Sequence, residues 1–355
     1  MKKILAPFCV LWTLFFLFTL AFPAERLSAA EVPNPKLESP ENWTIVVVPD
    51  PQQYTNPRNH ERYWQMFGWI ADNLEPLNVK TVLCVGDIVN SNAKPAQWKA
   101  SSKAFSFLDG KTPYVLCTGN HDYGSGGGNT RESNLDQYFP VDRNPKWDGV
   151  LVEVGENLMG KKTLENAAYQ FQGPQGQKLL VISLQFAPNE KLLDWARSLA
   201  AGKYADHFVI LLTHNYMNSH KRGDKRGSSH PYPVMKVDGL SGEEIWQKFV
   251  RSTPNVRMVI SGHISAADDF NGCVGWRVDK NDAGKPVYQM LFDTQALGGG
   301  FGGNGGDGWL RMLEFTPDMK RVKAYTYSPY FAQNPETAEK AFETSAINAF
   351  EFEIE

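Results

Sequence analysis

Short apolar runs rich in β-branched residues alternate with amphipathic helical segments along this chain, and no other feature of the sequence limits the possible folds as strongly. The predicted strands in the first part of the chain are residues 43–48, 79–85, 112–117, 207–213 and 256–261. The predicted helices between them are residues 60–74, 96–108, 189–201 and 242–252. Strands that alternate with helices in this way are typical of a layered α/β domain.

Further strands are predicted in the middle and at the end of the chain. Residues 167–172 and 178–186 indicate a hairpin. After residue 264 the pattern becomes mainly β, and its strands are expected to pair antiparallel; they are residues 269–279, 286–293, 308–318 and 320–328. We therefore predict an α/β fold of two packed mixed β-sheets, a β-sandwich, flanked by helices.

The N-terminus has the pattern of a targeting segment. Lys2 and Lys3 precede the apolar run 4–22, and the small residues 28–30 offer a cleavage site. Residues 1–30 are therefore expected to be a signal peptide that directs the protein to the periplasm or the medium. The run is also long enough to remain as an uncleaved membrane anchor. No later segment is expected to enter a membrane.

The remaining residues, 31–355, are expected to form a single domain, with a motif-bearing half (43–265) and a β-rich second half (266–355). The chain carries 36 basic and 39 acidic side chains, a net charge of −3, which does not favour a nucleic-acid partner. Cys84 and Cys117 each end an apolar run, so we expect them to be small buried side chains rather than a disulfide.

Polar residues follow the predicted strands where each strand ends. The groups are Asp50 and Gln52, Gly86-Asp87, Gly119-Asn120-His121-Asp122, His214-Asn215, and Gly262-His263. A single histidine or Gly-Asp pair at such a place is ordinarily structural or part of a turn. The ordered set indicates a site, because the carboxyl ends of strands in α/β sheets are where loops are held rigidly enough to build one.

Read in order, these groups resemble the calcineurin-like metallophosphoesterase superfamily over residues 45–265. The pattern of that superfamily is Asp-x-His, Gly-Asp, Gly-Asn-His-Asp/Glu, a lone His, and Gly-His-x-His. The Gly-Asn-His-Asp box, residues 119–122, is the most specific match. Residues 46–55 and 183–199 are similar to an exported bacterial branch in which glutamine replaces the first histidine.

The resemblance implies a metal-dependent phosphoester hydrolase, acting on diesters or monoesters through a metal-activated water. Two divalent ions held close together can clamp a phosphoryl group, and Asp87 is the implied bridge between them. Asp50 and Gln52 would bind one ion. The implied ligands of the other ion are Asn120, His214 and His263.

Two catalytic roles follow from the same resemblance. His121 would stabilise the transition state or protonate the leaving group, and Asp122 could orient its imidazole by accepting the second ring N–H. The substrate stays open among nucleotide, lipid, sugar and other phosphoesters. The alternative function is a binding protein that recognises a phosphorylated or polysaccharide ligand with a weakened site.

Two departures from the superfamily pattern affect the same metal position. Ser265 stands where the second histidine of Gly-His-x-His is usual, and Gln52 stands where the first is usual. Three outcomes follow: a single ion, two ions with an oxygen-rich first site, or binding without turnover. Mixed imidazole and oxygen ligands suit Mn, Fe or Zn, and an oxygen-rich position suits Mn, Mg or Ca. Asp268 and Asp269 could supply a carboxylate, although capping of a turn is the simpler interpretation.

Substrate contacts are predicted from the loops near the motifs. Residues 217–233 could form a basic lid, although an ordinary solvated loop explains them equally well. The glycine-rich stretches 124–128 and 298–308 are expected to form rims of a cleft. The candidate substrate-binding side chains are Tyr54, Tyr123, Asn215, Lys221 and Arg222.

Overall fold

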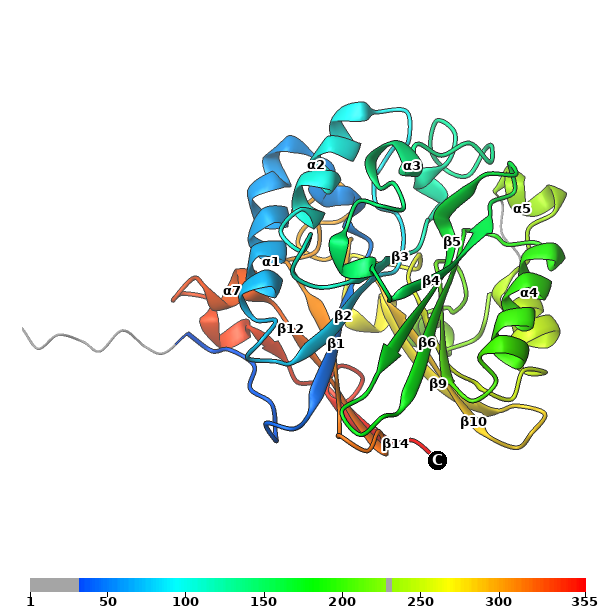
Figure 1. Cartoon of the computed structure of the whole chain (residues 1–355). Helices are drawn as coiled ribbons and strands as arrows, with labels where there is room; N and C mark the ends of the chain where they lie inside the picture. Colours follow the sequence, from blue (N-terminus) through cyan, green and yellow to red (C-terminus); the bar gives the residue numbers. More distant parts are fainter. Residues whose placement is uncertain (1–31, 228–231) are drawn as a thin grey trace, which may run out of the picture. The chain divides into compact units, whose positions relative to one another are not determined.

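The computed structural model describes residues 32–227 and 232–355, so the predicted signal peptide lies outside the described residues. Residues 32–355 form one compact unit. Its strands assemble into two mixed sheets that pack against each other, with helices on their outer faces (Figure 1). The predicted fold class is confirmed.

The first sheet has the strand order β13-β12-β11-β1-β2-β3, and β14 also pairs with β12. Its strands are β1 (Trp43–Val48), β2 (Val79–Cys84), β3 (Tyr114–Leu116), β11 (Leu310–Phe315), β12 (Arg321–Tyr327), β13 (Phe342–Glu343) and β14 (Phe350–Glu353). The strands β1, β2 and β3 run parallel, so their carboxyl ends lie at one edge.

The second sheet has the order β4-β5-β6-β7-β8-β10-β9. Its strands are β4 (Leu151–Glu156), β5 (Lys162–Gln172), β6 (Lys178–Leu184), β7 (Phe208–Thr213), β8 (Val256–Ser261), β9 (Val274–Lys280) and β10 (Pro286–Phe292). The parallel strands β6, β7, β8 and β10 form its centre.

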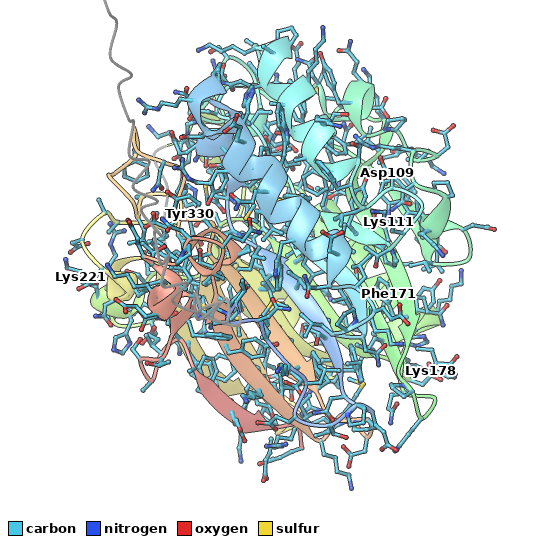
Figure 2. The ribbon with its side chains drawn as sticks, turned by 90° about the vertical axis from the view of Figure 1, so that its left-hand side faces the viewer. Asp109, Lys111, Phe171, Lys178, Lys221 and Tyr330 are labelled. Atoms are coloured by element: carbon cyan, nitrogen blue, oxygen red, sulfur yellow. The ribbon has the colours of Figure 1, made fainter. Side chains whose placement is uncertain are left out.

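Two layers of helices cover the sheets. The helices are α1 (His60–Asp72), α2 (Pro95–Phe105), α3 (Leu135–Tyr138), α4 (Glu190–Arg197), α5 (Pro233–Val237), α6 (Gly242–Ile245) and α7 (Pro329–Ala332). In Figure 1, α1, α2 and α7 lie on the outer side of the first sheet, and α4 lies on the outer side of the second. In Figure 2, α1 faces the viewer with Tyr330 of α7 beside it, and the guanidinium of Arg62 stacks on that ring at 4.4 Å.

The core follows from the alternation of side chains along the strands of the second sheet. In β7, Ile210 and Leu212 face the first sheet, whereas Val209 and Leu211 face the helices. Because successive side chains of a strand point to opposite faces, a strand buried on both sides is apolar throughout. The continuous apolar run in β7 is therefore a consequence of its central position.

Most predicted strands are found, but β4, β13 and β14 were not predicted. The strand β4 extends the predicted β5–β6 hairpin as a third antiparallel strand. The strands of the second half do pair antiparallel as β9 with β10 and β11 with β12, but the two pairs belong to different sheets. Strand periodicity sets which face is buried and contains no information about the partner strand.

Cys84, Cys117 and Cys273 are buried free cysteines, which confirms that Cys84 and Cys117 form no bridge. In the part of the chain that the structure describes, none of the helices is both long and apolar enough to span a bilayer.

Candidate metal centre

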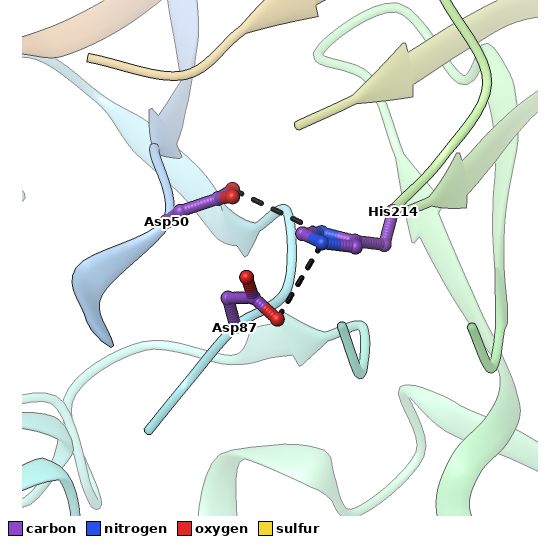
Figure 3. A group of neighbouring side chains, drawn as sticks. All are labelled: Asp50, Asp87 and His214. Carbon is purple, nitrogen blue, oxygen red and sulfur yellow. Dashed lines mark ion pairs between the residues drawn. The ribbon is translucent and has the colours of Figure 1, made fainter. Parts of the chain in front are cut away.

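Three side chains from different strand ends point toward one another at the edge where the two sheets meet. Asp50 follows β1, Asp87 follows β2 and His214 follows β7, and Figure 3 shows their polar atoms converging. One ligand atom of each lies within 4.8 Å of the others, and all three side chains are buried. Nδ1 of His214 is 3.9 Å from Oδ1 of Asp50, and its Nε2 is 3.5 Å from Oδ1 of Asp87. The predicted strand-end cluster therefore exists in the fold.

The ring of His214 is held in the orientation of a metal ligand. Its Nδ1 lies 2.8 Å from the carbonyl oxygen of Val85, so Nδ1 donates its proton there. A hydrogen bond from one ring nitrogen to a carbonyl is the usual way in which proteins orient the other nitrogen toward a metal. A side chain at Gly86, which has φ +113°, would lie 2.5 Å from Nδ1. Glycine is therefore required at this position.

Asn120 and His263 complete the side of the site around Nε2 of His214. Oδ1 of Asn120 lies 3.3 Å from that nitrogen, and Nδ1 of His263 lies 3.1 Å from it. Two imidazole nitrogens at this distance need a proton between them, and a metal ion bound by both can replace that proton. His214 thus contacts both of the side chains that are predicted to share an ion with it.

Two of the predicted ligands have an unusual backbone. Asp87 has φ +46° and His263 has φ +77°, which lie in the left-handed region. Residues other than glycine rarely adopt this conformation, and it concentrates at functional sites where the surrounding structure enforces it. Asp87 is fixed by the N–H of His121, which donates to its Oδ1 at 2.9 Å. The amide N–H of His263 donates to Oδ2 of Asp50 at 3.0 Å.

Divalent metal ions fit this donor set. Among the described atoms, Oδ1 of Asp50, Oε1 of Gln52 and Nδ2 of Asn120 are buried without a hydrogen-bond partner. Buried polar atoms are ordinarily satisfied, so unpartnered ones indicate a missing neighbour. A cation satisfies the two oxygens, and a phosphoryl oxygen can accept from the amide of Asn120. The identity and number of the ions stay predictions.

The pKa values of the carboxyl groups in the site are shifted in opposite directions. Burial opposes the charge of Asp87, but His214 and His121 outweigh it and hold the pKa of Asp87 below its usual range. Burial, together with the neighbouring Asp293 and Asp87, raises the pKa of Asp50. Burial also raises the pKa of Asp293 to about 6. A divalent cation would remove this conflict by stabilising all three charges at once.

The predicted role of Asp122 as a support for His121 is wrong. Nδ1 of His121 instead donates to the carbonyl oxygen of Asn90 at 2.8 Å. The carboxylate of Asp122 is buried and accepts the backbone N–H groups of Ile88, Val89 and Gly119 at 3.1, 3.0 and 2.8 Å. Asp122 therefore ties the loop after β2 to the loop after β3. It is a positioning residue for the whole site.

A cavity of about 600 Å³ opens directly onto the cluster. It is lined by Gln52, Gln53, Asp87, Asn90, Asn120, His121, Arg222, Tyr232, His263, Ile264, Ser265, Gln295 and Phe301. Most of these side chains are polar, and several are amides. Phe301 belongs to the predicted glycine-rich rim 298–308, so this stretch does border the cleft.

Only Arg222 among the five predicted substrate-binding side chains lines this cavity. Tyr54 is buried and accepts the N–H of Gly308, and Tyr123 is buried with its hydroxyl donating to Glu165 at 2.5 Å. Asn215 contacts the sulfur of Met235. Lys221 points outward, as Figure 2 shows, and pairs with Asp268. None of these four side chains lines the cavity. Tyr54, Tyr123 and Asn215 were predicted because they lie close in sequence to proposed ligands, which does not fix the direction of a side chain, and Lys221 was predicted from the charge of its loop.

Asp268 and Asp269 do not supply the missing ligand. Asp268 pairs with Lys221, and Asp269 accepts the N–H of Gly272 at the start of a short helical turn, as expected of a capping residue. The hydroxyl of Ser265 is also engaged in hydrogen bonds to the backbone. It donates to the carbonyl oxygen of Asp293 at 2.9 Å and accepts the N–H of Ala296 at 3.3 Å.

The structure also adds residues that the sequence reasoning missed, namely Asn90, Tyr232, Asp293 and Gln295. A usable signal existed for Asp293, because it is the last residue of the predicted strand 286–293, at a strand end like the motif residues. Tyr232 packs edge-on against His263 with ring centroids 5.6 Å apart. No sequence motif marks Tyr232.

The fold and this cluster define an α/β sandwich with a candidate metal centre at its strand ends, the architecture of a phosphoesterase. The family described as calcineurin-like phosphoesterase matches residues 44–266, and the chain belongs to that family. It is 30% identical over 292 residues to the uncharacterized protein YvnB of Bacillus subtilis (strain 168). The match covers 81% of this chain and 20% of that protein, so the chain spans about a fifth of the length of this relative.

Solved structures with a similar chain path have low sequence identity. The purple acid phosphatase PPD1 from yellow lupin (Lupinus luteus) seeds matches with a TM-score of 0.48 at 14% identity, over 91% of this chain and 55% of that one. GAP50, the anchor in the inner membrane complex of Plasmodium, gives 0.46 at 12% identity, over 88% and 89%. A putative 5'-nucleotidase from Staphylococcus aureus gives 0.44 at 13% identity, over 88% and 54%.

Proposed function

We propose that this protein is a metal-dependent phosphoester hydrolase that acts on small phosphodiesters or phosphomonoesters. The observation that supports this function most directly is the convergence of Asp50, Asp87 and His214 beside a cavity that Asp87 and His121 line. Divalent ions bound there would supply Lewis-acid activation of the phosphoryl group and of a water molecule. Membership of the calcineurin-like phosphoesterase family supports the same reaction class.

His121 is the proposed general acid. Its Nδ1 proton is engaged by the carbonyl oxygen of Asn90, so the proton that passes to the leaving oxygen is the second one, carried on Nε2 by the imidazolium form. Its backbone N–H meanwhile holds Asp87. One residue thus couples the position of the acid to the position of the proposed bridging carboxylate. An acid placed in this way favours turnover over the alternative of a binding protein.

A phosphodiester suits the cavity better than a phosphomonoester. Arg222 is the one lysine or arginine among the described residues that line it, and amides form much of the remaining wall. A monoester dianion needs more cationic charge beyond the metals than a diester monoanion does. Tyr232 and Phe301 offer aromatic surface at the same cavity for the organic group of a diester.

The function is tested with the purified protein loaded in turn with Mn²⁺, Zn²⁺, Fe²⁺, Mg²⁺ and Ca²⁺. Bis(p-nitrophenyl) phosphate and p-nitrophenyl phosphate serve as diester and monoester substrates. We expect metal-dependent hydrolysis, faster for the diester. Absence of turnover with every metal and both substrates would contradict the proposal.

Two variants separate the proposed roles. Asp87→Asn keeps the shape of the side chain and tolerates the left-handed backbone, yet removes the charge, so it should lose bound metal and activity together. His121→Asn should lower turnover by about 10²- to 10⁴-fold with metal content unchanged. Equal metal loss in both variants, measured by mass spectrometry of bound metal, would refute the assignment.

Export is part of the proposal and rests on residues 1–30, whose basic start, apolar run and small residues suit a signal peptide. The N-terminal sequence of the protein recovered outside the cytoplasm tests it. A mature chain that starts near residue 31 supports export with cleavage, and protein retained in the cytoplasm at full length contradicts it.

A further inference from the structure

The loop that follows β10 reaches the metal centre, although no motif of the sequence marks it. β8 and β10 are parallel neighbours with Leu291 opposite Ser261, so the chain leaves β10 beside the Gly262-His263 turn. Asp293 and Gln295 in this loop are 0% and 2% exposed. They therefore form part of the wall around Asp50.

Gln295 connects the proposed ligands of the first metal. Its Nε2 donates to Oδ2 of Asp50 at 3.2 Å and to Oδ2 of Asp293 at 3.0 Å. Its Oε1 accepts from Nε2 of Gln52 at 2.6 Å. Nε2 of Gln52 also donates to Oδ2 of Asp87 at 2.9 Å. Five oxygen-bearing side chains thus surround one small volume.

The buried carboxylates and the acceptor oxygens without a hydrogen-bond partner in this volume indicate a bound cation. The carboxyl groups of Asp50, Asp87 and Asp293 are all buried there. Buried carboxylates without a compensating charge are costly, and hard divalent ions such as Mn²⁺, Mg²⁺ and Ca²⁺ prefer oxygen ligands. Oδ1 of Asp50 and Oε1 of Gln52 have no hydrogen-bond partner among the described residues, and both are buried. These two atoms are an independent indication of a bound ion.

Ser265 acts on this loop instead of on the metal. Its hydroxyl bridges the carbonyl oxygen of Asp293 and the N–H of Ala296, at 2.9 and 3.3 Å. The serine that replaces the usual histidine therefore fixes the loop that carries Asp293 and Gln295. Ser265 and the loop that follows β10 are thus linked directly by hydrogen bonds.

We propose that Asp293 and Gln295 complete the ligand set of the ion bound by Asp50, in place of the imidazole that Ser265 lacks, and that this oxygen-rich position selects a hard divalent ion. The inference rests on the proposed metal-dependent function and specifies its first metal position. Ser265 is a positioning residue in this arrangement.

The test is Mn²⁺ binding to the full protein after removal of metal, followed by electron paramagnetic resonance and by mass spectrometry of bound metal. Asp293→Asn and Gln295→Leu should each weaken one bound Mn²⁺ by at least about 10- to 100-fold, since even the loss of an outer-shell partner of a ligand costs that much. Any second Mn²⁺, at His214 and His263, should remain. Asp318→Asn makes the same change in an exposed turn and should bind Mn²⁺ as the unchanged protein does.

The outcomes separate the inference from the proposed function. Mn²⁺ affinities within about twofold of the unchanged protein in both loop variants would overturn the inference, since a lost ligand costs far more. Loss of all metal from Asp87→Asn in the same experiment would leave the proposed function standing. A protein that binds no Mn²⁺, Mg²⁺ or Zn²⁺ at all would overturn both. Circular dichroism confirms that each variant is folded before it is scored.

Discussion

Glycine at position 262 is required by the carboxylate beneath it. A Cβ there would lie 2.2 Å from Oδ1 of Asp50, one of the two buried oxygens without a partner. Gly119 is similar, since its Cβ would lie 2.1 Å from Oδ1 of Asp87. Both glycines belong to the motif pattern. They are explained by the space that the missing Cβ leaves for the proposed ligands, more than by the conformation of a turn. Backbone approaches of this kind are a general reason for glycine at functional sites.

Gly262→Ala should therefore displace Asp50 and weaken Mn²⁺ binding by about 10- to 100-fold, as expected for a ligand held out of place. Isothermal titration with Mn²⁺ measures the effect. The matched control is Gly68→Ala in the middle of α1, where no described atom lies within 4 Å of the added Cβ. The control should gain about 0.5–1 kcal/mol of unfolding free energy and bind metal normally. Unchanged binding in Gly262→Ala would contradict the role given to Asp50.

At the level of elements, the loop after β7 is fixed by an ion-pair cluster. Arg226 in this loop donates to Glu243 of α6 and to Asp279 of β9, each at 2.7 Å, and its guanidinium lies 4.4 Å from the ring centroid of Trp246. Arg277 pairs with the same Asp279. The loop also carries Arg222 and Tyr232, which line the cavity. Its anchoring therefore bears on how the cavity is shaped.

Asp279→Asn should destabilise the protein by about 1 kcal/mol at pH 7, a value reduced for the partial exposure of Asp279. Burial acts to raise the pKa of Asp279, but Arg277, Gln289 and Arg226 outweigh it, so the pKa lies below its usual 3.8. A lowered carboxyl pKa stabilises the fold above the unfolded-state pKa, and this contribution is lost as the pH falls below it.

Urea unfolding at pH 7 and near pH 3 measures the difference between Asp279→Asn and the unchanged protein. The difference should shrink at the lower pH, because the carboxyl group of Asp279 is then largely protonated in the unfolded chain, whereas its lowered pKa keeps it ionised in the folded protein. Asp282→Asn, which removes an exposed pair with Arg251, is the control and should cost less than about 0.5 kcal/mol. A pH-independent difference for Asp279→Asn would contradict the electrostatic explanation.

The sequence predicts elements well where periodicity and strand-end motifs coincide. The strand β1 has its predicted bounds, and the residues after β1, β2, β3, β7 and β8 do meet. The contribution of β10 was missed, because Asp293 and Gln295 match no motif and come together with Asp50 only through the parallel pairing of β8 with β10. Side-chain direction was the other limit, as the buried Tyr54 and Tyr123 demonstrate. Long-range pairing and rotamers are set by packing that a single sequence does not express.

At the level of the whole molecule, residues 32–355 bury carboxylates that a bound cation would stabilise only in the folded state. Binding to the native state alone adds about 2.7 kcal/mol of unfolding free energy when the free ion is at 100 times its dissociation constant. Metal binding, thermal stability and turnover should therefore rise together. Such coupling would show that the centre contributes to folding and to chemistry through the same ligands.

The most direct measurement is a Mn²⁺ titration of the metal-stripped protein in which bound Mn²⁺, melting temperature and hydrolysis of bis(p-nitrophenyl) phosphate are recorded on the same samples. The account predicts that all three increase over the same range of Mn²⁺ in the unchanged protein and that none of them responds in Asp87→Asn. Hydrolysis that persists in excess chelator, or Asp87→Asn with the Mn²⁺ response of the unchanged protein, would contradict a metal centre built on Asp50, Asp87 and His214.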